Sequence, residues 1–421
     1  MQELYKKLAN LIRITNLKED NFRKAESADF KKMAPTTDRF RLYVHFPFCS
    51  KLCKDCLFSK RLVDEGVANN YCEALLKEIE YVGEHYKKSK SKIPSVFFGG
   101  GTPTLIPLDY LKKIIDKIKF YFIEEDTSEI TLECHPGSLT PEKVEAYKAM
   151  GINRLSVGIQ SFQDEVLDEM KRNHNSQQAV DTLKYVKKSG MNFSIDLMYG
   201  FDTQTVEGFL NDVQMALDLG ITHISLYNYV KKLDNIQAEE ELETKQTNMF
   251  NGVTKLLTNA GFTQYTIDDF ALTEAKKGQY NVDQVAIPRR HTLVFGTSAK
   301  GFTDGNIYYS KYVSIETYIK CIEKKIPPLY FIENRDNAST AMGILMGLHS
   351  LTLNRSDLKK EFGIDPIEIP QSLITELKNR NVMEVTDSVV KYTEGKVQAF
   401  KTLSMKIQCH DIKPPKDPEN I

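Results

Sequence analysis

The strongest constraint on the fold is a regular alternation of short apolar runs with longer amphipathic segments between Arg41 and Tyr229. The apolar runs are rich in Val, Ile, Phe and Tyr and are too short for helices, so they predict buried parallel strands. The six runs are Leu42–Phe46, Val96–Phe98, Ile130–Glu133, Arg154–Ile159, Phe193–Met198 and His223–Tyr227. The helical patterns between them are Tyr71–Tyr86, Leu108–Tyr121, Pro141–Met150, Gln177–Lys188 and Thr205–Leu219.

Six successive strand–helix units imply right-handed crossovers and a single parallel sheet. Because six units are fewer than the eight of a closed barrel, we expect an α/β fold built on a partial, TIM-like (β/α)6 barrel. Its functional site should lie at the carboxyl ends of the strands. Thr140 followed by Pro141 predicts a helix start, and Gly151 and Gly190 predict two helix ends.

The remaining segments predict units around this core. Residues 231–248 turn polar, with four glutamates close together, and predict a solvated helix or a linker. Residues 338–407 predict helices followed by a small hairpin, the order of a winged-helix module. We expect an N-terminal helical extension (1–39), a (β/α)6 core (40–265), a core extension contributing to a substrate pocket (266–335), a winged-helix-like domain (336–408) and a flexible tail (409–421).

Charge and hydropathy limit the partners of the chain. It has 56 basic and 57 acidic side chains, and a general polyanion binder needs a clear basic excess. No uninterrupted apolar run reaches the ~18 residues of a membrane-spanning helix. Residues 1–39 show no contiguous signal-peptide core. We therefore expect a cytoplasmic protein that binds neither nucleic acid nor membrane.

Three of the seven cysteines are closely spaced: Cys49, Cys53 and Cys56 form a C-x3-C-x2-C pattern directly after the first predicted strand. Three thiolates on one loop can hold three corners of a [4Fe-4S] cluster and leave one iron open to another ligand. The alternative is a closed zinc site with His45 as the fourth ligand, since Cys3His is an ordinary zinc set. The spacing leaves both open.

A second signal is the run Gly99-Gly100-Gly101-Thr102-Pro103-Thr104, directly after the second predicted strand. Consecutive glycines allow a backbone to pass close to a ligand and to present N–H groups to it. The run matches neither the dinucleotide-binding fingerprint nor the P-loop. A plain tight turn is the alternative interpretation.

Together these motifs resemble the radical S-adenosylmethionine (SAM) enzymes, and within them the oxygen-independent coproporphyrinogen III oxidase family with its relatives, the haem chaperones and the methyl-transferring members. The resemblance covers roughly residues 40–330. It rests on the segments Tyr43–Cys49 with the cysteines that follow, Gly99–Thr104, Glu133–Pro136, Asn153–Phe162, Arg172 with His174, Ile195–Gly200 and Ser225–Tyr229.

The resemblance implies that Cys49, Cys53 and Cys56 hold a [4Fe-4S] cluster whose open iron binds the amino and carboxylate groups of SAM. It also implies a second SAM beside the first. Positions that match contacts to the first molecule are Tyr43, Gly100 and Glu133, and those that match the second are Gly101, Thr102, Gln160, Arg172 and Asp196. Without the resemblance, Glu133 and Asp196 would be interpreted as salt-bridged strand ends, and Arg172 as a charge on a helix surface.

The implied chemistry is one-electron cleavage of SAM to a 5'-deoxyadenosyl radical, which takes a hydrogen atom from the substrate. This requires a reducing compartment and an electron donor such as a flavodoxin or ferredoxin.

Three departures from the family pattern bear on the activity. Asp55 stands where an aromatic residue usually precedes the third cysteine, and Phe58 stands where the oxidases have a further cysteine. The haem motif of the chaperones, H-N-x-x-Y-W, has no counterpart in Tyr280–His291, and the chain has no tryptophan. His291 is left as an isolated candidate haem ligand, and His45 and His174 are interpreted as hydrogen-bonded scaffold.

We therefore expect an enzyme that binds two SAM molecules and acts on a bulky substrate, with a tetrapyrrole as the first candidate. The outcome is either methyl or methylene transfer or oxidative decarboxylation, and the missing cysteine favours carbon transfer. The alternative from a different class is a haem chaperone that binds haem without substrate turnover.

Overall fold

The computed structural model describes residues 22–35, 40–54, 56, 59–86, 95–123, 128–231, 236–287, 290–302, 308–310, 313–332, 347–363, 365 and 373–401. The predicted tail, 409–421, lies outside these residues. Within them, no helix combines the length and the apolar character needed to cross a bilayer.

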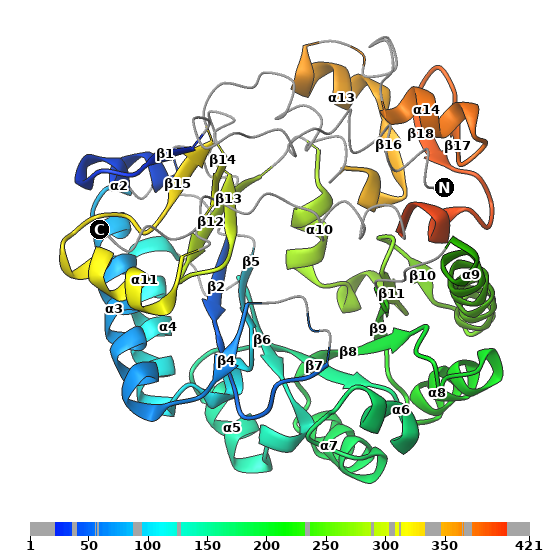
Figure 1. Ribbon diagram of the computed structural model, residues 1–421, viewed down its shortest axis with the longest axis horizontal. Coiled ribbons are helices and arrows are strands. Elements are labelled where there is room, and N and C mark those ends of the chain that lie inside the picture. The colour runs from blue at the N-terminus through cyan, green and yellow to red at the C-terminus, as the bar shows by residue number, and fades with distance from the viewer. Residues whose placement is uncertain are drawn as a thin grey trace.

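One large mixed sheet organises the molecule, in the strand order β1-β15-β14-β13-β12-β2-β5-β6-β7-β8-β9-β11-β10. Its parallel part curves into an open barrel (Figure 1). The parallel strands are β12 (His291–Phe295), β2 (Phe40–Phe46), β5 (Ser95–Gly100), β6 (Glu129–Cys134), β7 (Arg154–Gln160), β8 (Asn192–Tyr199) and β9 (His223–Asn228). All six predicted strands are confirmed, with every end within two residues.

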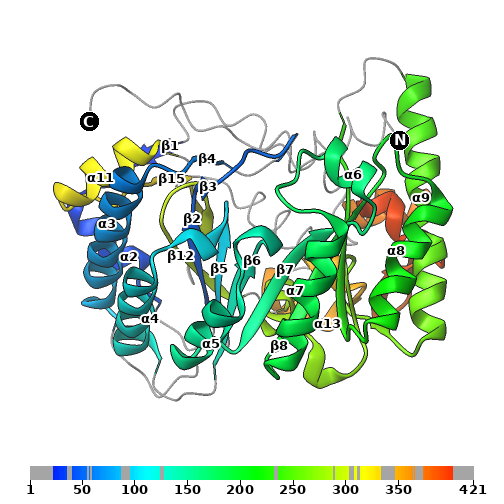
Figure 2. The same ribbon diagram turned by 90° about the horizontal axis from the view of Figure 1, so that it is seen from below.

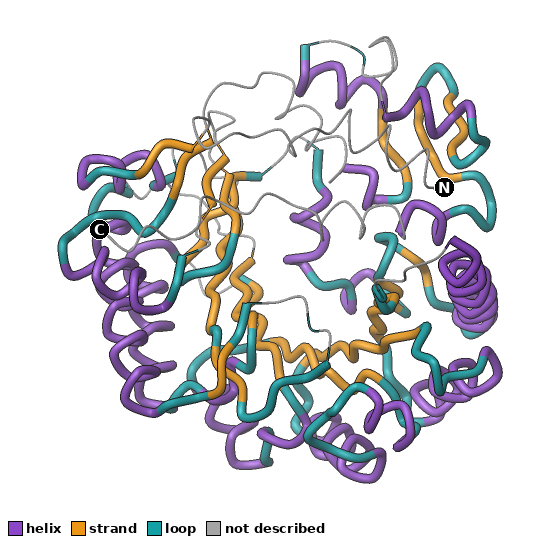
Figure 3. Tube along the Cα trace, in the orientation of Figure 1, coloured by secondary structure: helices purple, strands orange, loops and turns teal. Residues whose placement is uncertain are grey.

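Helices cover the outer face of this barrel, as the tube in Figure 3 and the turned view in Figure 2 show. They are α3 (Glu65–Gly83), α4 (Leu108–Phe122), α5 (Pro141–Ala149), α7 (Ser176–Lys188), α8 (Val206–Asp218) and α9 (Ile236–Asn259). The short α6 (Asp164–Glu169) lies in the loop after β7, where Val166 packs with Phe201 and Tyr229 in a separate apolar cluster. In α4 the buried residues Leu111, Ile114, Ile115, Ile118 and Phe122 recur with the helical period, so one apolar stripe faces the sheet.

Local capping chemistry sets the helix ends. Thr140 accepts a hydrogen bond from the Lys143 backbone N–H, with Pro141 in the first turn, as predicted. Gly151 and Gly190 follow their helices at φ angles of 90° and 75°, where a side chain would be strained. Helix α3 begins six residues before the predicted start, because Asp64 caps it by accepting from the Val67 N–H.

The two edges of the barrel differ from the prediction. Strand β12 lies parallel to β2, with His291 opposite Phe40, which makes seven parallel strands instead of six. Beyond it the sheet continues antiparallel through β13 (Lys300–Phe302), β14 (Tyr308–Ser310), β15 (Tyr330–Ile332) and β1 (Phe22–Lys24). The predicted N-terminal helical extension therefore contains a strand, and its described helix is the short α2 (Phe30–Met33).

At the other edge, β11 (Asp269–Ala271) lies antiparallel to β9 and is followed in the sheet by β10 (Thr263–Gln264). Helix α10 (Gln279–Val285) lies on the concave side of the sheet (Figure 1). There Asp283 accepts a hydrogen bond from Ser95, the first residue of β5 (2.8 Å between oxygens). Helix α10 therefore closes the amino-terminal end of the barrel, and α11 (Ile315–Glu323) packs against α3 outside it.

The C-terminal residues form a small unit with its own apolar core, which includes Leu353, Leu358, Ile374, Leu377 and Val390. Its elements are β16 (Thr352–Asn354), α13 (Arg355–Phe362), α14 (Leu373–Asn379), β17 (Met383–Val385) and β18 (Val389–Tyr392). The strands form a three-stranded sheet in the order β16-β18-β17. The predicted hairpin is present, whereas β16 was not predicted.

Candidate functional site

The three closely spaced cysteines lie on the loop that leaves β2, which we call the Cys loop (residues 47–63). Cys49 belongs to the short strand β3 (Phe48–Cys49), which pairs with β4 (Arg61–Leu62) and so closes the loop. Cys49 is buried, and Cys53 and Cys56 are half-buried. Burial raises the pKa of the Cys49 thiol, and Cys56 and Cys53 add to that rise, so the three sulfurs lie within electrostatic reach of one another.

Three thiols on one loop fit the donor set of an iron–sulfur cluster. Among the described residues, no three His, Cys, Asp or Glu side chains gather closely enough to hold a single metal ion, so the structure does not decide between the cluster and zinc. His45 instead lies beside Tyr43, with its Nδ1 3.2 Å from the Tyr43 hydroxyl oxygen.

The glycine run packs directly against the Cys loop. A Cβ on Gly101 would lie 2.6 Å from the Phe48 carbonyl oxygen and 3.0 Å from the Cys49 sulfur. Gly100 has a φ of 116°, and a Cβ there would lie 2.6 Å from the His45 ring. These positions therefore require glycine so that the loop after β5 can approach the cysteines.

The backbone N–H groups of this run are already occupied, which corrects the expectation that they are free to bind a ligand. Gly101 donates to the Phe46 carbonyl (2.8 Å) and Thr102 to the Phe48 carbonyl (2.9 Å). Gly100 donates to the Glu133 carboxylate (3.0 Å). The run therefore joins the Cys loop to β6. Because it lacks side chains, a ligand could approach its backbone closely.

Two carboxylates, Glu133 on β6 and Asp196 on β8, lie on the strands to either side of β7. Burial, with the nearby charge of Asp196, raises the pKa of Glu133 to about 8. Burial also raises the pKa of Asp196 to about 7, although the Ser156 hydroxyl donates to both of its oxygens (3.3 and 3.2 Å). Neither residue forms the salt-bridged strand end that is the alternative interpretation of the sequence, because no ion pair joins either to a cation among the described residues. A cationic ligand would relieve this excess of negative charge.

Gln160 and Arg172 each carry a polar atom that the described residues leave unsatisfied. Gln160 ends β7 at a φ of 71°, and its buried Oε1 has no hydrogen-bond partner. Arg172 donates to the Gly158 carbonyl (2.8 Å) and lies 3.5 Å from the Cys53 sulfur, but its buried Nε has no partner. Arg172 is thus turned toward the Cys loop, and not outward as a surface charge. Buried polar atoms of this kind are typical of a site that receives a polar ligand.

Tyr43 lies on β2 at the inner side of the barrel. Its ring stacks on Phe97, with centroids 6.1 Å apart and planes at 18°. It also lies 6.4 Å from the ring of Tyr280 on α10, and its contact with SAM stays a prediction.

A pair of histidines connects the loops that carry these residues. The Gly137 N–H donates to His135 Nδ1 (3.0 Å), so the ring proton of His135 is on Nε2 and can donate to His174 Nδ1 (3.4 Å). His174 Nε2 then donates to the Ile159 carbonyl (3.1 Å). Burial lowers the pKa of His174 to about 4, in agreement with a neutral pair. The prediction that His174 is hydrogen-bonded scaffold agrees with this geometry.

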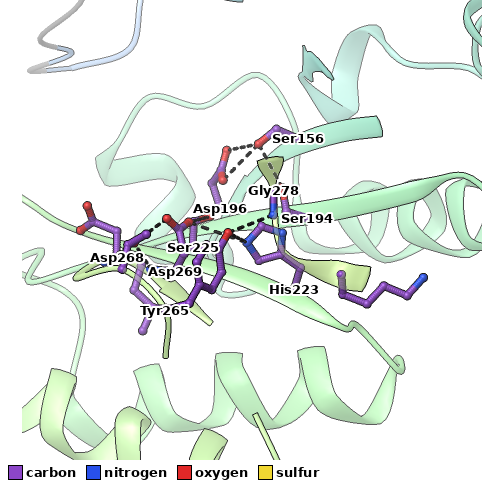
Figure 4. Close-up of polar contacts among 12 residues, drawn as sticks. Ser156, Ser194, Asp196, His223, Ser225, Tyr265, Asp268, Asp269 and Gly278 are labelled. Carbon is purple, nitrogen blue, oxygen red and sulfur yellow. Dashed lines mark hydrogen bonds and ion pairs between the residues drawn. The ribbon is translucent and has the colours of Figure 1, made fainter. Parts of the chain in front are cut away.

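The sequence analysis missed Asp269, a third carboxylate, which β11 contributes from outside the six predicted units. It accepts hydrogen bonds from Ser225 (2.7 Å) and Thr266 (2.6 Å) and lies 3.7 Å from His223 Nε2. Figure 4 shows this group beside Asp196. The available signal was the alternation of polar residues, His223, Ser225 and Tyr227, within an otherwise apolar strand.

The region that replaces the haem motif lies away from the cysteines. His291 is the first residue of β12 and pairs in register with Phe40, the first residue of β2, so it lies at the amino-terminal edge of the barrel. It is 1% exposed. His291 is therefore buried at the end of the barrel opposite the Cys loop, which does not suit an axial ligand for haem bound at the carboxyl edge.

Known proteins resemble parts of this chain. Residues 43–216 match the model of the Radical SAM superfamily. The chain is 33% identical over 245 residues to the protein named heme chaperone HemW of Haemophilus influenzae, which covers 56% of this chain and 64% of that protein. It is 29% identical to the HemW of Bacillus subtilis, over 62% of this chain and 71% of that protein. The match thus spans slightly less than two thirds of the first relative.

A solved structure shares the fold of almost the whole chain. It is the coproporphyrinogen III oxidase HemN of Escherichia coli, described as a radical SAM enzyme, with a TM-score of 0.75 and 22% identity. The likeness covers 93% of this chain and 94% of that chain. At this level of identity it supports the α/β fold with its TIM-like core.

Proposed function

We propose, from the premise that this chain carries a radical SAM domain, that it binds a [4Fe-4S] cluster and SAM at the carboxyl edge of its barrel and handles haem or a related tetrapyrrole there. The observation that carries the proposal is the meeting of the Cys loop, the glycine run and Glu133 at one edge of the sheet. A cluster and SAM are what a radical SAM domain implies. The residue assignments, the number of SAM molecules and the tetrapyrrole are our proposals.

In this proposal Cys49, Cys53 and Cys56 are the cluster ligands. When bound, the reduced cluster supplies the electron that cleaves SAM. Gly100 and Gly101 keep side chains out of the space beside the Cys loop. Arg172, 3.5 Å from the Cys53 sulfur, offers positive charge to the thiolate side of the centre.

The polar residues of the barrel interior would bind SAM. Tyr43, Gly100 and Glu133 are assigned to the first molecule. Glu133 can accept from its ammonium group, since the carboxylate lies at the end of β6 beside the glycine run. A second molecule is assigned to Gly101, Thr102, Gln160, Arg172 and Asp196. The unsatisfied Gln160 Oε1 and Arg172 Nε support a polar ligand on that side.

Of the two functions that the sequence left open, the relatives named heme chaperones favour haem handling without turnover. Turnover of a tetrapyrrole is kept as the second candidate, because this chain lacks the chaperone haem motif and buries His291 at the far edge of the barrel. Turnover would also require an electron donor that reaches the cluster.

One anaerobic experiment separates the two candidates. Reconstituted protein is incubated with dithionite and SAM, with and without haem, and 5'-deoxyadenosine and S-adenosylhomocysteine are quantified while haem binding is followed by absorbance. A chaperone binds haem and yields less than one 5'-deoxyadenosine per chain. An enzyme supplied with its tetrapyrrole substrate yields one or more, and S-adenosylhomocysteine then indicates methyl transfer.

The matched variants are Cys53→Ala, which should abolish SAM cleavage, and Cys321→Ala, which removes a buried cysteine of α11 outside the C-x3-C-x2-C motif and should retain it. Cleavage that persists in Cys53→Ala would refute the ligand assignment.

A further inference from the structure

Two buried polar side chains of helix α3 adjoin the start of the Cys loop. Tyr71 and Glu78 are seven residues apart, about two helical turns, so they lie on the same face of the helix. Both are fully buried. A hydroxyl and a carboxyl at such positions destabilise the fold unless hydrogen bonds satisfy them. Their partners are therefore informative, and those partners lie at the ends of β2 and β12.

The hydroxyl of Tyr71 joins the ends of these two strands. It donates to the carbonyl of His45, the residue before the last one of β2 (2.9 Å). It also accepts from the backbone N–H of Thr297, two residues after the end of β12 (2.9 Å). Because β2 and β12 are paired in the sheet, one hydroxyl connects the point where the Cys loop begins to the point where the chain leaves β12.

The ring of Tyr71 packs against the two phenylalanines at the start of the Cys loop. Its centroid lies 6.2 Å from that of Phe46 and 5.7 Å from that of Phe48, and both pairs are edge-on. The carbonyls of these two phenylalanines accept the hydrogen bonds of the glycine run, and Phe48 directly precedes Cys49. Tyr71 thus contacts the segment between β2 and the first proposed cluster ligand through both its hydroxyl and its ring.

Glu78 binds the loop after β12. Its Oε2 accepts from the Gly296 backbone N–H (2.9 Å) and from the Tyr318 hydroxyl of α11 (2.8 Å). The Tyr318 ring in turn packs against Tyr71, with centroids 4.9 Å apart. Gly296 has a φ of 85°, and a Cβ there would collide with the Tyr71 hydroxyl and lie 2.6 Å from the His45 carbonyl oxygen. The loop after β12 therefore approaches β2 so closely that only glycine fits.

We propose that Tyr71 and Glu78 are positioning residues of the cluster site, whose hydrogen bonds hold the start of the Cys loop and thereby the three thiols. They act through the backbone at the ends of β2 and β12. A buried polar network whose members are hydrogen-bonded fixes one arrangement of the segments that it joins. The inference rests on the proposed function, because it takes Cys49, Cys53 and Cys56 as the cluster ligands. It assigns a role at that site to side chains outside every motif of the sequence.

The first test is amide hydrogen exchange of the apo-protein. The Arg61 and Val63 N–H groups donate to the carbonyls of Pro47 and Cys49 (both 2.9 Å), so their exchange reports opening of the Cys loop. Tyr71→Phe keeps the ring and removes the hydroxyl. The two amides should then exchange about tenfold faster, the usual worth of one hydrogen bond. A residue that serves overall stability alone would instead speed the slowest amides of the core and leave these two unchanged.

The second test follows the loss of iron from the reconstituted protein to a chelator. Tyr71→Phe and Glu78→Leu should lose iron about tenfold faster than the wild type, at the lower end of the effect of residues that support metal ligands. Glu78→Gln keeps an oxygen that can accept from Gly296, so it should stay within about threefold of the wild type. The control is Tyr147→Phe, because the buried Tyr147 hydroxyl of α5 has no hydrogen-bond partner among the described residues. It should change neither measurement.

The proposal is overturned if Tyr71→Phe keeps the wild-type exchange at the two loop amides, or speeds loop and core amides equally. It is also overturned if the loop amides exchange faster while iron loss from Tyr71→Phe and Glu78→Leu stays at the wild-type rate. A wild type that takes up neither iron nor sulfide would contradict the proposed function, and the exchange result would still decide whether Tyr71 holds the Cys loop.

Discussion

The two ends of the barrel interior carry similar polar side chains but differ in how those side chains are satisfied. At the amino-terminal end, Arg154 hydrogen-bonds His223 Nδ1, donates to the Lys276 carbonyl (2.8 Å) and lies 3.6 Å from the Glu129 carboxylate. At the carboxyl end, Glu133 and Asp196 have raised pKa values, chiefly because of burial. Burial raises the pKa of Glu129 as well, but Arg154 opposes that rise, whereas no ion pair joins Glu133 or Asp196 to a cation among the described residues. We call Arg154, Glu129 and His223 the lower layer, whose carboxylate has a cationic partner within the chain, and Glu133 and Asp196 the upper layer, to which a cationic ligand would supply one.

The largest effect should come from breaking the lower layer. Arg154→Met leaves Glu129 without its cation and His223 without its donor, and removal of one partner of a buried ion pair costs about 3–5 kcal/mol. Urea unfolding of the apo-protein measures the loss. The control is Lys112→Met, which removes the exposed Lys112–Asp116 pair and should cost under about 0.5 kcal/mol. Equal effects for the two variants would remove the distinction between the layers.

The upper layer should respond in the opposite way. Glu133→Gln removes a buried carboxylate whose ionisation is opposed by burial and by Asp196, so the free energy of unfolding of the apo-protein should stay the same or rise. SAM binding should weaken about 10- to 100-fold, which is the usual worth of a hydrogen bond to a charged group. Equilibrium binding and urea unfolding, measured on the same variant, test both parts. A large loss of stability with unchanged SAM affinity would make Glu133 a structural residue.

The pH dependence sharpens this contrast further. The pKa of Glu133 rises from 4.5 to about 8 and that of Asp196 from 3.8 to about 7 on folding. The folded protein therefore holds more protons than the unfolded one, and the stability of the apo-protein should fall as pH rises from about 4 to about 8. Affinity for the cationic SAM should rise over pH 6–8 with release of protons. Calorimetric titration in two buffers of different ionisation enthalpy measures that release, and a flat affinity with no release would contradict it.

The smallest effect is expected at Tyr43. Tyr43→Phe keeps the ring that stacks on Phe97 and removes the hydroxyl 3.2 Å from His45 Nδ1. Stability should change by about 1 kcal/mol or less, and SAM affinity should fall by up to about tenfold. Thermal unfolding without SAM measures the change in stability, and the rise in unfolding temperature on addition of SAM compares the affinities of the variant and the wild type. A fall in stability that exceeds the loss of affinity would assign the hydroxyl to the fold alone.

The sequence predicted the parallel core well because each strand is an apolar run bounded by recognisable turns. The strands at the edges of the sheet were harder to predict. Residues 292–295 are strand-like, but their pairing with β2 joins segments about 250 positions apart, which no local pattern indicates. The same holds for β1, a three-residue strand whose partner is β15. Short strands of this kind are fixed by tertiary pairing, not by local propensity.

The site was predictable where a motif carries it, as at Cys49 and the glycine run. The role of the glycines could not be predicted from the motif. Their N–H groups bind acceptors within the protein, and the absence of a side chain lets Gly101 pack closely against Phe48. Asp269 was missed because it comes from β11, an antiparallel strand outside the repeating units.

The central claim is that three thiols of the Cys loop hold an iron–sulfur cluster, and the most direct measurement is the iron, acid-labile sulfide and zinc content of anaerobically reconstituted protein. The wild type should contain about four irons and four sulfides per chain, and Cys53→Ala far less of both. Stoichiometric zinc with neither iron nor sulfide in the wild type would contradict it.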